Sequence, residues 1–165
     1  MAEATRPALI LFSHGSTLCG AAQALREHAA RLRSCAEWEM VEVGFLNFSS
    51  PRFSDVVTRL VACGTSKIVV VPYFLVAGKF VCEDLSAEIA KLRVLFPQVE
   101  FLVAEPFGYD PLLAEILLDL AANALPHEHW RDDLLKAADF CEERQDCSLY
   151  GAPPCKASAA QGAHL

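Results

Sequence analysis

The sequence predicts an α/β fold with three layers, in which an open parallel sheet of four strands carries helices on both faces. Two patterns support this prediction. Four short apolar runs have the length of strands, and a stretch of helical periodicity follows each of them. The third run, IVVVPYF, is β-branched and nearly continuous, which is typical of a strand buried on both faces. Because strands that alternate with helices are joined by right-handed crossovers, we expect the strands to run parallel.

The predicted strands coincide with the four apolar runs. Pro72 stands near the end of the third run, and since proline has no backbone N–H, we expect regular pairing to stop close to it. The predicted strands are Ala8–Phe12, Val41–Leu46, Ile68–Phe74 and Val99–Ala104.

The predicted helices carry apolar residues three or four positions apart, which places those residues on one face. Ser16 or Thr17 is a candidate N-cap of the first helix, and Gly64 is a candidate C-cap glycine. The four apolar stripes are Leu18, Ala22, Leu25, Ala29 and Leu32; Phe53, Val56, Val57, Leu60 and Val61; Leu85, Ile89, Leu92 and Leu95; and Leu113, Ile116, Leu117 and Leu120.

The pattern changes after about residue 125, where LPHEHW interrupts it. A short amphipathic stretch follows, and the last ten residues are rich in Ala, Ser and Gly. We therefore expect an α/β domain over residues 1–125 and a C-terminal extension over residues 126–165. The extension is predicted to hold a short helix and a cysteine-containing, partly disordered tail.

Composition excludes some classes of function. The net charge of -7 and the pI of about 5.2 argue against a general nucleic-acid binder, because such proteins displace counterions with a basic face. No apolar run is long enough to span a bilayer, and the longest candidate is interrupted by Asp119. No secretory signal is visible, so we expect a cytoplasmic protein without a membrane partner.

Candidate site residues follow the predicted strands, because open α/β sheets bind ligands beyond the carboxyl ends of their strands. The four segments there are SHGST, NFSSPRF, LVAGKFVCED and EPFGYDP. His14 lies in the first of them. It is either a packed, hydrogen-bonded bystander or a group that holds a metal or a proton. Gly15 favours the second reading, because glycine lets a ligand approach the backbone closely.

Four blocks of sequence resemble those of one enzyme family. LFSHGST, VEVGFLNFSSP, GTSKIVVVPYFLVAGKFVCEDL and AEPFGYDPLLAEIL are similar, in order and spacing over residues 8–124, to the sirohydrochlorin chelatase family of CbiX/SirB type. A weaker resemblance to the histidine phosphatases fails, because their signature has Arg directly before the His and this chain has Ser13. The first resemblance implies a chelatase-like fold that inserts Co2+ or Fe2+ into a modified tetrapyrrole of cobalamin or siroheme biosynthesis. Short, single-lobe members of this family usually form homodimers.

The resemblance also implies roles for individual residues. His14 would be the metal ligand and the proton acceptor, since two pyrrole N–H protons must leave the ring. Lys79 and Arg52 are candidate anchors for the carboxylates of the macrocycle, or else ordinary solvated charges. The residues predicted to line the substrate site are Ser13, Gly15, Ser16, Asn47, Lys79, Phe80 and Glu105.

Two of the three metal-site positions of the family pattern are substituted in this chain. Asn47 stands where the pattern has a Glu, and Phe80 stands where it has a His. An amide oxygen is a weak ligand for a transition metal, and a phenyl ring is none, although it can stack on a flat macrocycle. Cys82 is a soft candidate ligand nearby. The aromatic residues that would line the ring pocket include Phe48, Phe107 and Tyr109, whereas Phe45 and Phe74 are interpreted as core residues.

Seven cysteines, in a chain without an export signal, favour thiols or metal ligands over disulfides. Cys141, Cys147 and Cys155 have the spacing C-x5-C-x7-C, which is not that of a zinc ribbon and lacks the four cysteines of an iron–sulfur site. The tail is therefore either an iron–sulfur or zinc site completed by other residues, or an oxidisable, flexible segment. For the whole chain, the first hypothesis is a chelatase, and the alternative is a non-catalytic relative that binds a tetrapyrrole or a metal.

Overall fold

The structure is a computed structural model that describes residues 7–18, 20–35, 38, 40–127, 144–147, 150 and 155. In chain order its elements are β1 (Ala8–Ser13), α1 (Gln23–Arg33), β2 (Met40–Phe45), α2 (Phe53–Ala62), β3 (Lys67–Pro72), η1 (Phe80–Leu85), α3 (Ser86–Leu95), β4 (Glu100–Val103) and α4 (Pro111–Ala122). The predicted alternation of strands and helices is confirmed.

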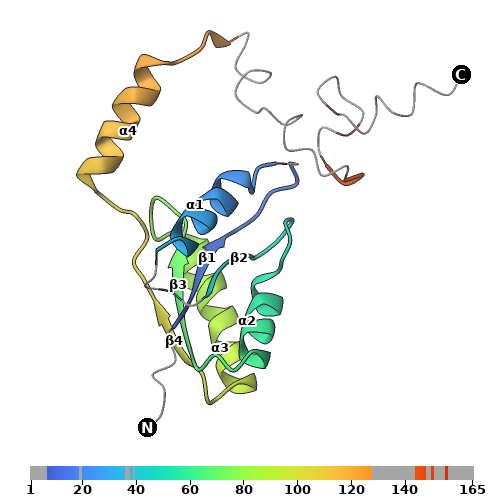
Figure 1. The fold of residues 1–165 in the computed structure, drawn as a ribbon. Helices are drawn as coiled ribbons and strands as arrows, with labels where there is room; N and C mark the ends of the chain where they lie inside the picture. The colour runs from blue at the N-terminus through green and yellow to red at the C-terminus, as the bar shows by residue number, and fades with distance from the viewer. Residues whose placement is uncertain are drawn as a thin grey trace, which may run out of the picture. The chain divides into compact units, whose positions relative to one another are not determined.

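The described strands form one parallel sheet in the order β2-β1-β3-β4, with all arrows pointing the same way (Figure 1). Pairing of β1 with β3 ends at Phe12 and Pro72, so the proline terminates β3 as the sequence predicts. Because β1 lies between β2 and β3, the loops that follow these three strands meet at one edge of the sheet. That edge holds the predicted site.

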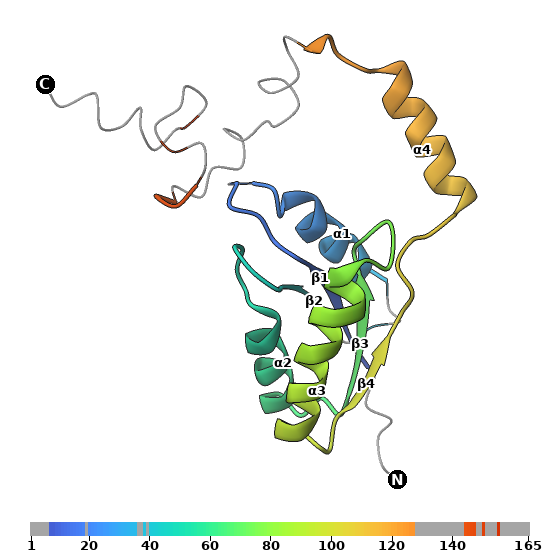
Figure 2. The same cartoon turned by 180° about the vertical axis from the view of Figure 1, so that it is seen from behind.

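Helices cover both faces of the sheet, as the sequence predicts. Helices α2 and α3 lie in front of the sheet in Figure 2, and α1 lies on the opposite face. The core between the sheet and α2 and α3 is formed by buried side chains of alternate strand positions and of the helix stripes. Each of its valine, leucine, isoleucine and phenylalanine side chains contributes about 1.5–3 kcal/mol when it leaves water. This core consists of Ala8, Ile10, Phe12, Phe53, Val56, Val57, Leu60, Ile68, Val70, Leu85, Ile89, Leu92, Val99 and Phe101.

The first helix begins later than the sequence predicts. Helix α1 starts at Gln23, and Leu18 precedes it. The hydroxyl of Ser16 accepts a hydrogen bond from the backbone N–H of Leu18 at 3.0 Å, and Gly20 has a φ of 78°. Both features favour a turn over a helix in this segment. The prediction that Ser16 or Thr17 caps this helix is therefore wrong.

The ends of the next two helices show one success and one error. Helix α2 ends in a Schellman turn: Thr65 N–H donates to Leu60 O at 3.1 Å, and Gly64 has a φ of 90°. The predicted C-cap glycine is thus confirmed. The third apolar stripe, predicted to be buried, includes one residue too many, because Leu95 is 67% exposed while Leu92 is only 3% exposed.

The chain forms two compact units. The first holds the described residues up to Gly15 and from Ala24 to Gly108, and it contains the sheet. The second holds Ser16–Gln23 and the described residues from Tyr109 onward, and it contains α4.

Asp110 caps α4 by accepting a hydrogen bond from Leu112 N–H at 2.8 Å. Of the helices formed by the described residues, none combines the length and the apolar character needed to cross a membrane.

Candidate functional site

The loops that follow β1 and β2 are bonded to each other through their backbones. Leu46 N–H donates to Ser13 O, and Asn47 N–H donates to His14 O, each at 2.9 Å. Within the second loop, Ser49 N–H donates to Asn47 O at 2.6 Å. These bonds continue the pairing of β1 with β2 beyond the strand ends. They therefore fix the backbone of His14 relative to that of Asn47.

Gly15 makes this close approach possible. Its φ is +85°, and a Cβ atom at this position would lie 1.8 Å from the carbonyl oxygen of Asn47. Real Cβ atoms essentially never approach another heavy atom closer than 3.0 Å. Only glycine therefore fits here, for reasons of both backbone conformation and space.

The imidazole of His14 lies among phenyl rings. Its centroid is 5.2 Å from that of Phe80, with an angle of 13° between the planes, so the two rings stack. Phe74 is 5.9 Å from the imidazole and 6.1 Å from Phe80. Phe80 is the first residue of η1 and is 41% exposed, and His14 is also exposed. The three rings form a partly open aromatic cluster at the strand ends, and the exposed part of the Phe80 ring suits contact with a planar ligand.

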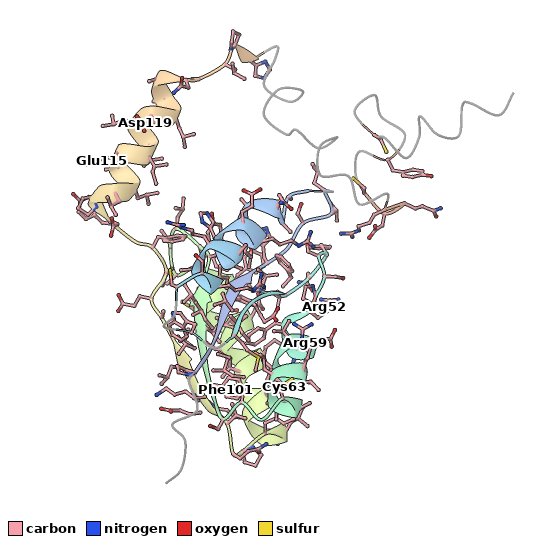
Figure 3. All side chains as sticks on the ribbon, in the orientation of Figure 1. Arg52, Arg59, Cys63, Phe101, Glu115 and Asp119 are labelled. Atoms are coloured by element: carbon pink, nitrogen blue, oxygen red, sulfur yellow. The ribbon has the colours of Figure 1, made fainter. Side chains whose placement is uncertain are left out.

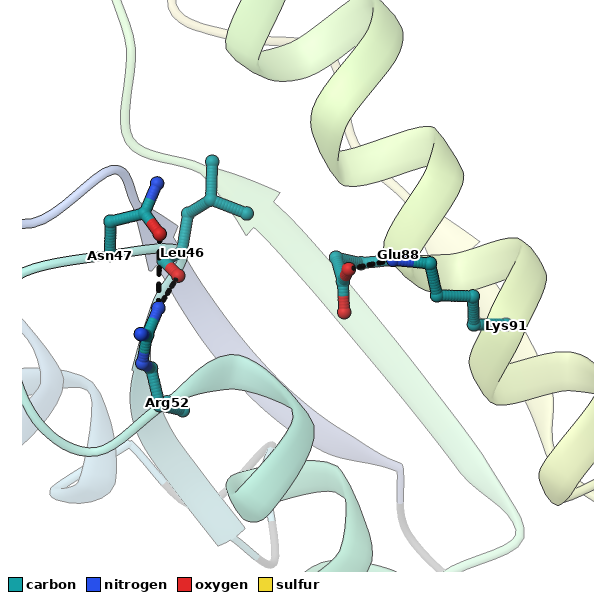
Figure 4. Close-up of polar contacts among 5 residues, drawn as sticks. All are labelled: Leu46, Asn47, Arg52, Glu88 and Lys91. Carbon is teal, nitrogen blue, oxygen red and sulfur yellow. Dashed lines mark hydrogen bonds and ion pairs between the residues drawn. The ribbon is translucent and has the colours of Figure 1, made fainter.

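Arg52 determines how Asn47 presents its side chain. One guanidinium nitrogen of Arg52, Nη1, donates to Asn47 Oδ1 at 3.0 Å and also donates to the carbonyl oxygen of Leu46 (Figure 4). The same residues border a cavity of about 210 Å³ between the β2 loop, the start of α2 and α3. The cavity is lined by Phe45, Leu46, Asn47, Arg52, Phe53, Ser54 and Glu88.

The other predicted site residues are less closely joined. Lys79 is exposed and directly precedes Phe80. Glu105 is exposed just beyond the end of β4, which β3 separates from β1. Ser16 belongs to the second compact unit, where its hydroxyl forms the turn described above. The structure thus brings together Ser13, His14, Gly15, Asn47 and Phe80.

Comparison with known families identifies this arrangement. The family model CbiX matches residues 8–124, which include all four strands and the loops at their carboxyl ends. The chain belongs to the CbiX family. The match ends close to residue 125, where the sequence pattern changes.

Relatives of this CbiX chain carry informative names. The sirohydrochlorin cobaltochelatase of Methanopyrus kandleri is 31% identical over 145 residues, which cover 73% of this chain and 99% of the relative. That of Saccharolobus solfataricus is 32% identical over 87 residues, covering 49% of this chain and 68% of the relative.

Solved structures agree in fold. A CbiX protein of cobalamin (vitamin B12) biosynthesis from Marinobacter aquaeolei VT8 is 26% identical, with a TM-score of 0.55, and the match covers 70% of this chain and 94% of that one. SirB from Bacillus subtilis subspecies spizizenii, solved in complex with cobalt, has a TM-score of 0.67 at 19% identity, covering 81% of this chain and 61% of that one. At such low identity, the second likeness concerns the fold alone.

Sequence reasoning missed two contacts of this CbiX site. Phe74 packs on Phe12 at 6.1 Å, as expected of a core residue, but it also contacts His14. The sequence presents Arg52 as a candidate anchor but does not predict its bond to Asn47. In the sequence, the only indication of this bond is that Asn47 and Arg52 are polar and lie five residues apart just after β2. Phe45, at 2% exposure, is a core residue as expected.

The cysteines add no cluster among the described residues. No group of three His, Cys, Asp or Glu side chains there is arranged to hold a metal ion. The Sγ of Cys82 donates to Ala77 O at 3.2 Å. Cys147 and Cys155 are buried, and Cys141 lies outside the described residues. Beside Cys147, a hydrogen bond from Arg144 lowers the pKa of Asp146.

Proposed function

We propose that this chain is a chelatase that inserts a divalent metal, Co2+ or Fe2+, into a sirohydrochlorin-type tetrapyrrole. The observation that carries the proposal is the CbiX match, which spans every strand end of the sheet and includes His14. The name of the Methanopyrus kandleri relative, of which almost the whole length is matched, supports it. In this proposal the metal is a substrate that is delivered to the ring.

His14 is the proposed metal ligand and proton acceptor. An exposed imidazole can bind a first-row divalent metal and, in its neutral form, can accept a proton from a pyrrole nitrogen. The stack with Phe80 holds the imidazole plane, and the half-open phenyl ring offers a surface for the macrocycle. Insertion then requires that the metal leave His14 for four ring nitrogens, which a weak and incomplete ligand set favours.

The remaining predicted residues have supporting roles in this proposal. Ser13 and Gly15 hold His14 against the β2 loop through the backbone. Ser16, Lys79 and Glu105 are proposed to contact substituents of the ring.

A second candidate function is a non-catalytic relative that binds a tetrapyrrole or a metal. It is favoured by Asn47 and Phe80, which leave His14 with neither of the two other ligands in the family pattern. It is also supported by the lack, within the described ranges, of any group of three metal-binding side chains.

We further propose a homodimer. Helix α4 carries Glu115 and Asp119 four residues apart (Figure 3), and leucine, isoleucine and alanine occupy most of its other positions. A helix so largely apolar is expected to be covered in the working assembly.

Three expectations from the sequence stay predictions: a domain boundary after residue 125, a cytoplasmic location, and a metal or cluster site at Cys141, Cys147 and Cys155. Metal analysis of the full chain and of a truncation before Cys141 tests the last of these.

The deciding experiment is an anaerobic insertion assay with purified protein, sirohydrochlorin and either Co2+ or Fe2+, followed by absorbance. A chelatase increases the rate above that of the spontaneous reaction. A binding relative shifts the absorbance of the ring without turnover. If the protein neither binds the ring at micromolar concentration nor accelerates insertion, both candidate functions are wrong.

A further inference from the structure

The cavity between the β2 loop and α3 is bordered by Asn47, a side chain whose orientation is chemically unambiguous. A guanidinium group has N–H donors and no acceptor, so the atom of Asn47 that faces Arg52 at 3.0 Å must be the amide oxygen. The amide nitrogen Nδ2 therefore points away from Arg52, as Figure 4 shows. Among the described residues, Nδ2 donates to none. Residue 47 thus presents two N–H donors where the family pattern has a carboxylate.

This orientation disfavours a metal ion at residue 47. The accepting oxygen is already bound by a positive guanidinium, which would repel a second cation at that atom. The free end of the amide carries hydrogens and has no lone pair to donate. Asn47 is therefore arranged to bind an acceptor rather than a Lewis acid.

The charges around the cavity also favour an anion. Glu88 lies on its α3 side and is paired with Lys91 at 2.6 Å, which balances its charge. With Glu88 balanced by Lys91, Arg52 gives the groups around the cavity one net positive charge. Arg52 offers a positive charge and Nδ2 of Asn47 offers separate N–H donors, and both suit carboxylate oxygens.

We propose that Asn47 and Arg52 bind carboxylate substituents of the tetrapyrrole, so that residue 47 recognises the ring and does not ligate the metal. This inference rests on the proposed function, because the carboxylates are taken to belong to the ring. The backbone N–H of Asn47 donates to His14 O at 2.9 Å, so a ring anchored here is held at the loop that is bonded to the loop of His14. The anchor thereby replaces a lost metal ligand with a substrate contact.

The test is an anaerobic titration of metal-free sirohydrochlorin into the full chain and its variants. Asn47→Asp keeps the side-chain shape but replaces the N–H donors with a negative charge, and Arg52→Gln removes the positive charge. Each is expected to raise the Kd for the ring at least tenfold. The matched control is Arg59→Gln, which removes an arginine from the last turn of α2, the helix whose N-cap is Arg52 (Figure 3). Arg59 pairs with Glu42 at 2.9 Å and does not border the cavity, so the Kd should stay within twofold.

Two further readouts separate recognition from a structural role. In ¹⁵N-labelled wild-type protein, the side-chain amide resonances of Asn47 are expected to shift when the ring is added. In a titration with Co2+ alone, Asn47→Ala is expected to bind within twofold of the wild type. Glu88→Gln, which removes the negative charge from the cavity, is expected to tighten ring binding.

The outcomes distinguish this inference from the proposed function. Wild-type and variant proteins that bind the ring equally, with an unmoved Asn47 amide, overturn the anchor and leave the chelatase intact. A tenfold loss of Co2+ affinity in Asn47→Ala overturns the exclusion of the metal. Ring binding that depends on Asn47 and Arg52, in a protein without insertion activity, supports the anchor and contradicts the chelatase. Failure of the wild type to bind the ring overturns both.

Discussion

The contact between the β1 and β2 loops predicts an order of stability for three glycine-to-alanine variants. Gly78→Ala adds a methyl group where no atom lies within 4 Å and φ is not positive. Gly64→Ala meets no atom either, but its φ is +90°. Gly15→Ala combines a φ of +85° with a Cβ placed 1.8 Å from Asn47 O. The series therefore separates backbone conformation from steric contact.

The expected costs follow from these differences. Gly78→Ala should change the free energy of unfolding by about 0.5 kcal/mol or less, as is usual at exposed positions. Gly64→Ala should cost about 1–2 kcal/mol for the left-handed conformation. Gly15→Ala carries the same conformational cost. In addition, its methyl group must push the Asn47 carbonyl away until the distance reaches at least 3.0 Å. That shift weakens the bonds from Leu46 N–H to Ser13 O and from Asn47 N–H to His14 O, worth about 1 kcal/mol each.

The total for Gly15→Ala is thus about 3–4 kcal/mol. Urea denaturation of the three variants, followed by circular dichroism, measures the order. Because His14 is adjacent, Gly15→Ala should also slow metal insertion under conditions in which it remains folded, whereas Gly78→Ala should not. A Gly15→Ala variant that is no less stable than Gly64→Ala would refute the idea that the two loops are locked against each other at this point.

Three other predictions follow from single contacts. Phe80→His places a second imidazole beside His14 and should raise Co2+ affinity at least tenfold in calorimetric titration, while Phe80→Leu should not; equal affinities would contradict the ring geometry. Leu92→Ala should destabilise the protein by about 2–5 kcal/mol in urea denaturation. Leu95→Ala should cost about 0.5 kcal/mol or less, and a similar loss in both would contradict the observed burial. Asp110→Ala should cost about 1 kcal/mol through the lost N-cap, seen as faster amide exchange in the first turn of α4; unchanged exchange would show that the cap contributes nothing.

The strands were predictable because their signal is local. Apolar runs such as Ile68–Phe74 contain several consecutive β-branched residues. Pro72 ends the pairing because it has no backbone N–H, whatever the position of its strand in the sheet. The helix ends were less predictable, because they depend on one or two specific bonds. The bond from Leu18 N–H to the Ser16 hydroxyl favours a turn over the first predicted helical turn, although the apolar spacing continues through it.

The same distinction applies to the site. His14 could be found from sequence, because a strand end followed by glycine is a local pattern and strand ends converge in parallel sheets. The orientation of the Asn47 amide could not be found in this way, because it depends on a bond from Arg52 across the turn that follows β2. The stack of His14 on Phe80 joins the loop after β1 to the first residue of η1, which is far from it in sequence. Periodicity contains no information about such a contact.

The central claim is that His14 carries metal transfer in this CbiX chain, and one ratio tests it most directly. This is the initial rate of anaerobic Co2+ insertion into sirohydrochlorin for the wild type, divided by that for His14→Ala, both at saturating ring. If His14 is metal ligand and proton acceptor, the wild type exceeds the spontaneous rate, and the variant falls by about 100-fold or more while still binding the ring. Equal rates for the two proteins would contradict the claim.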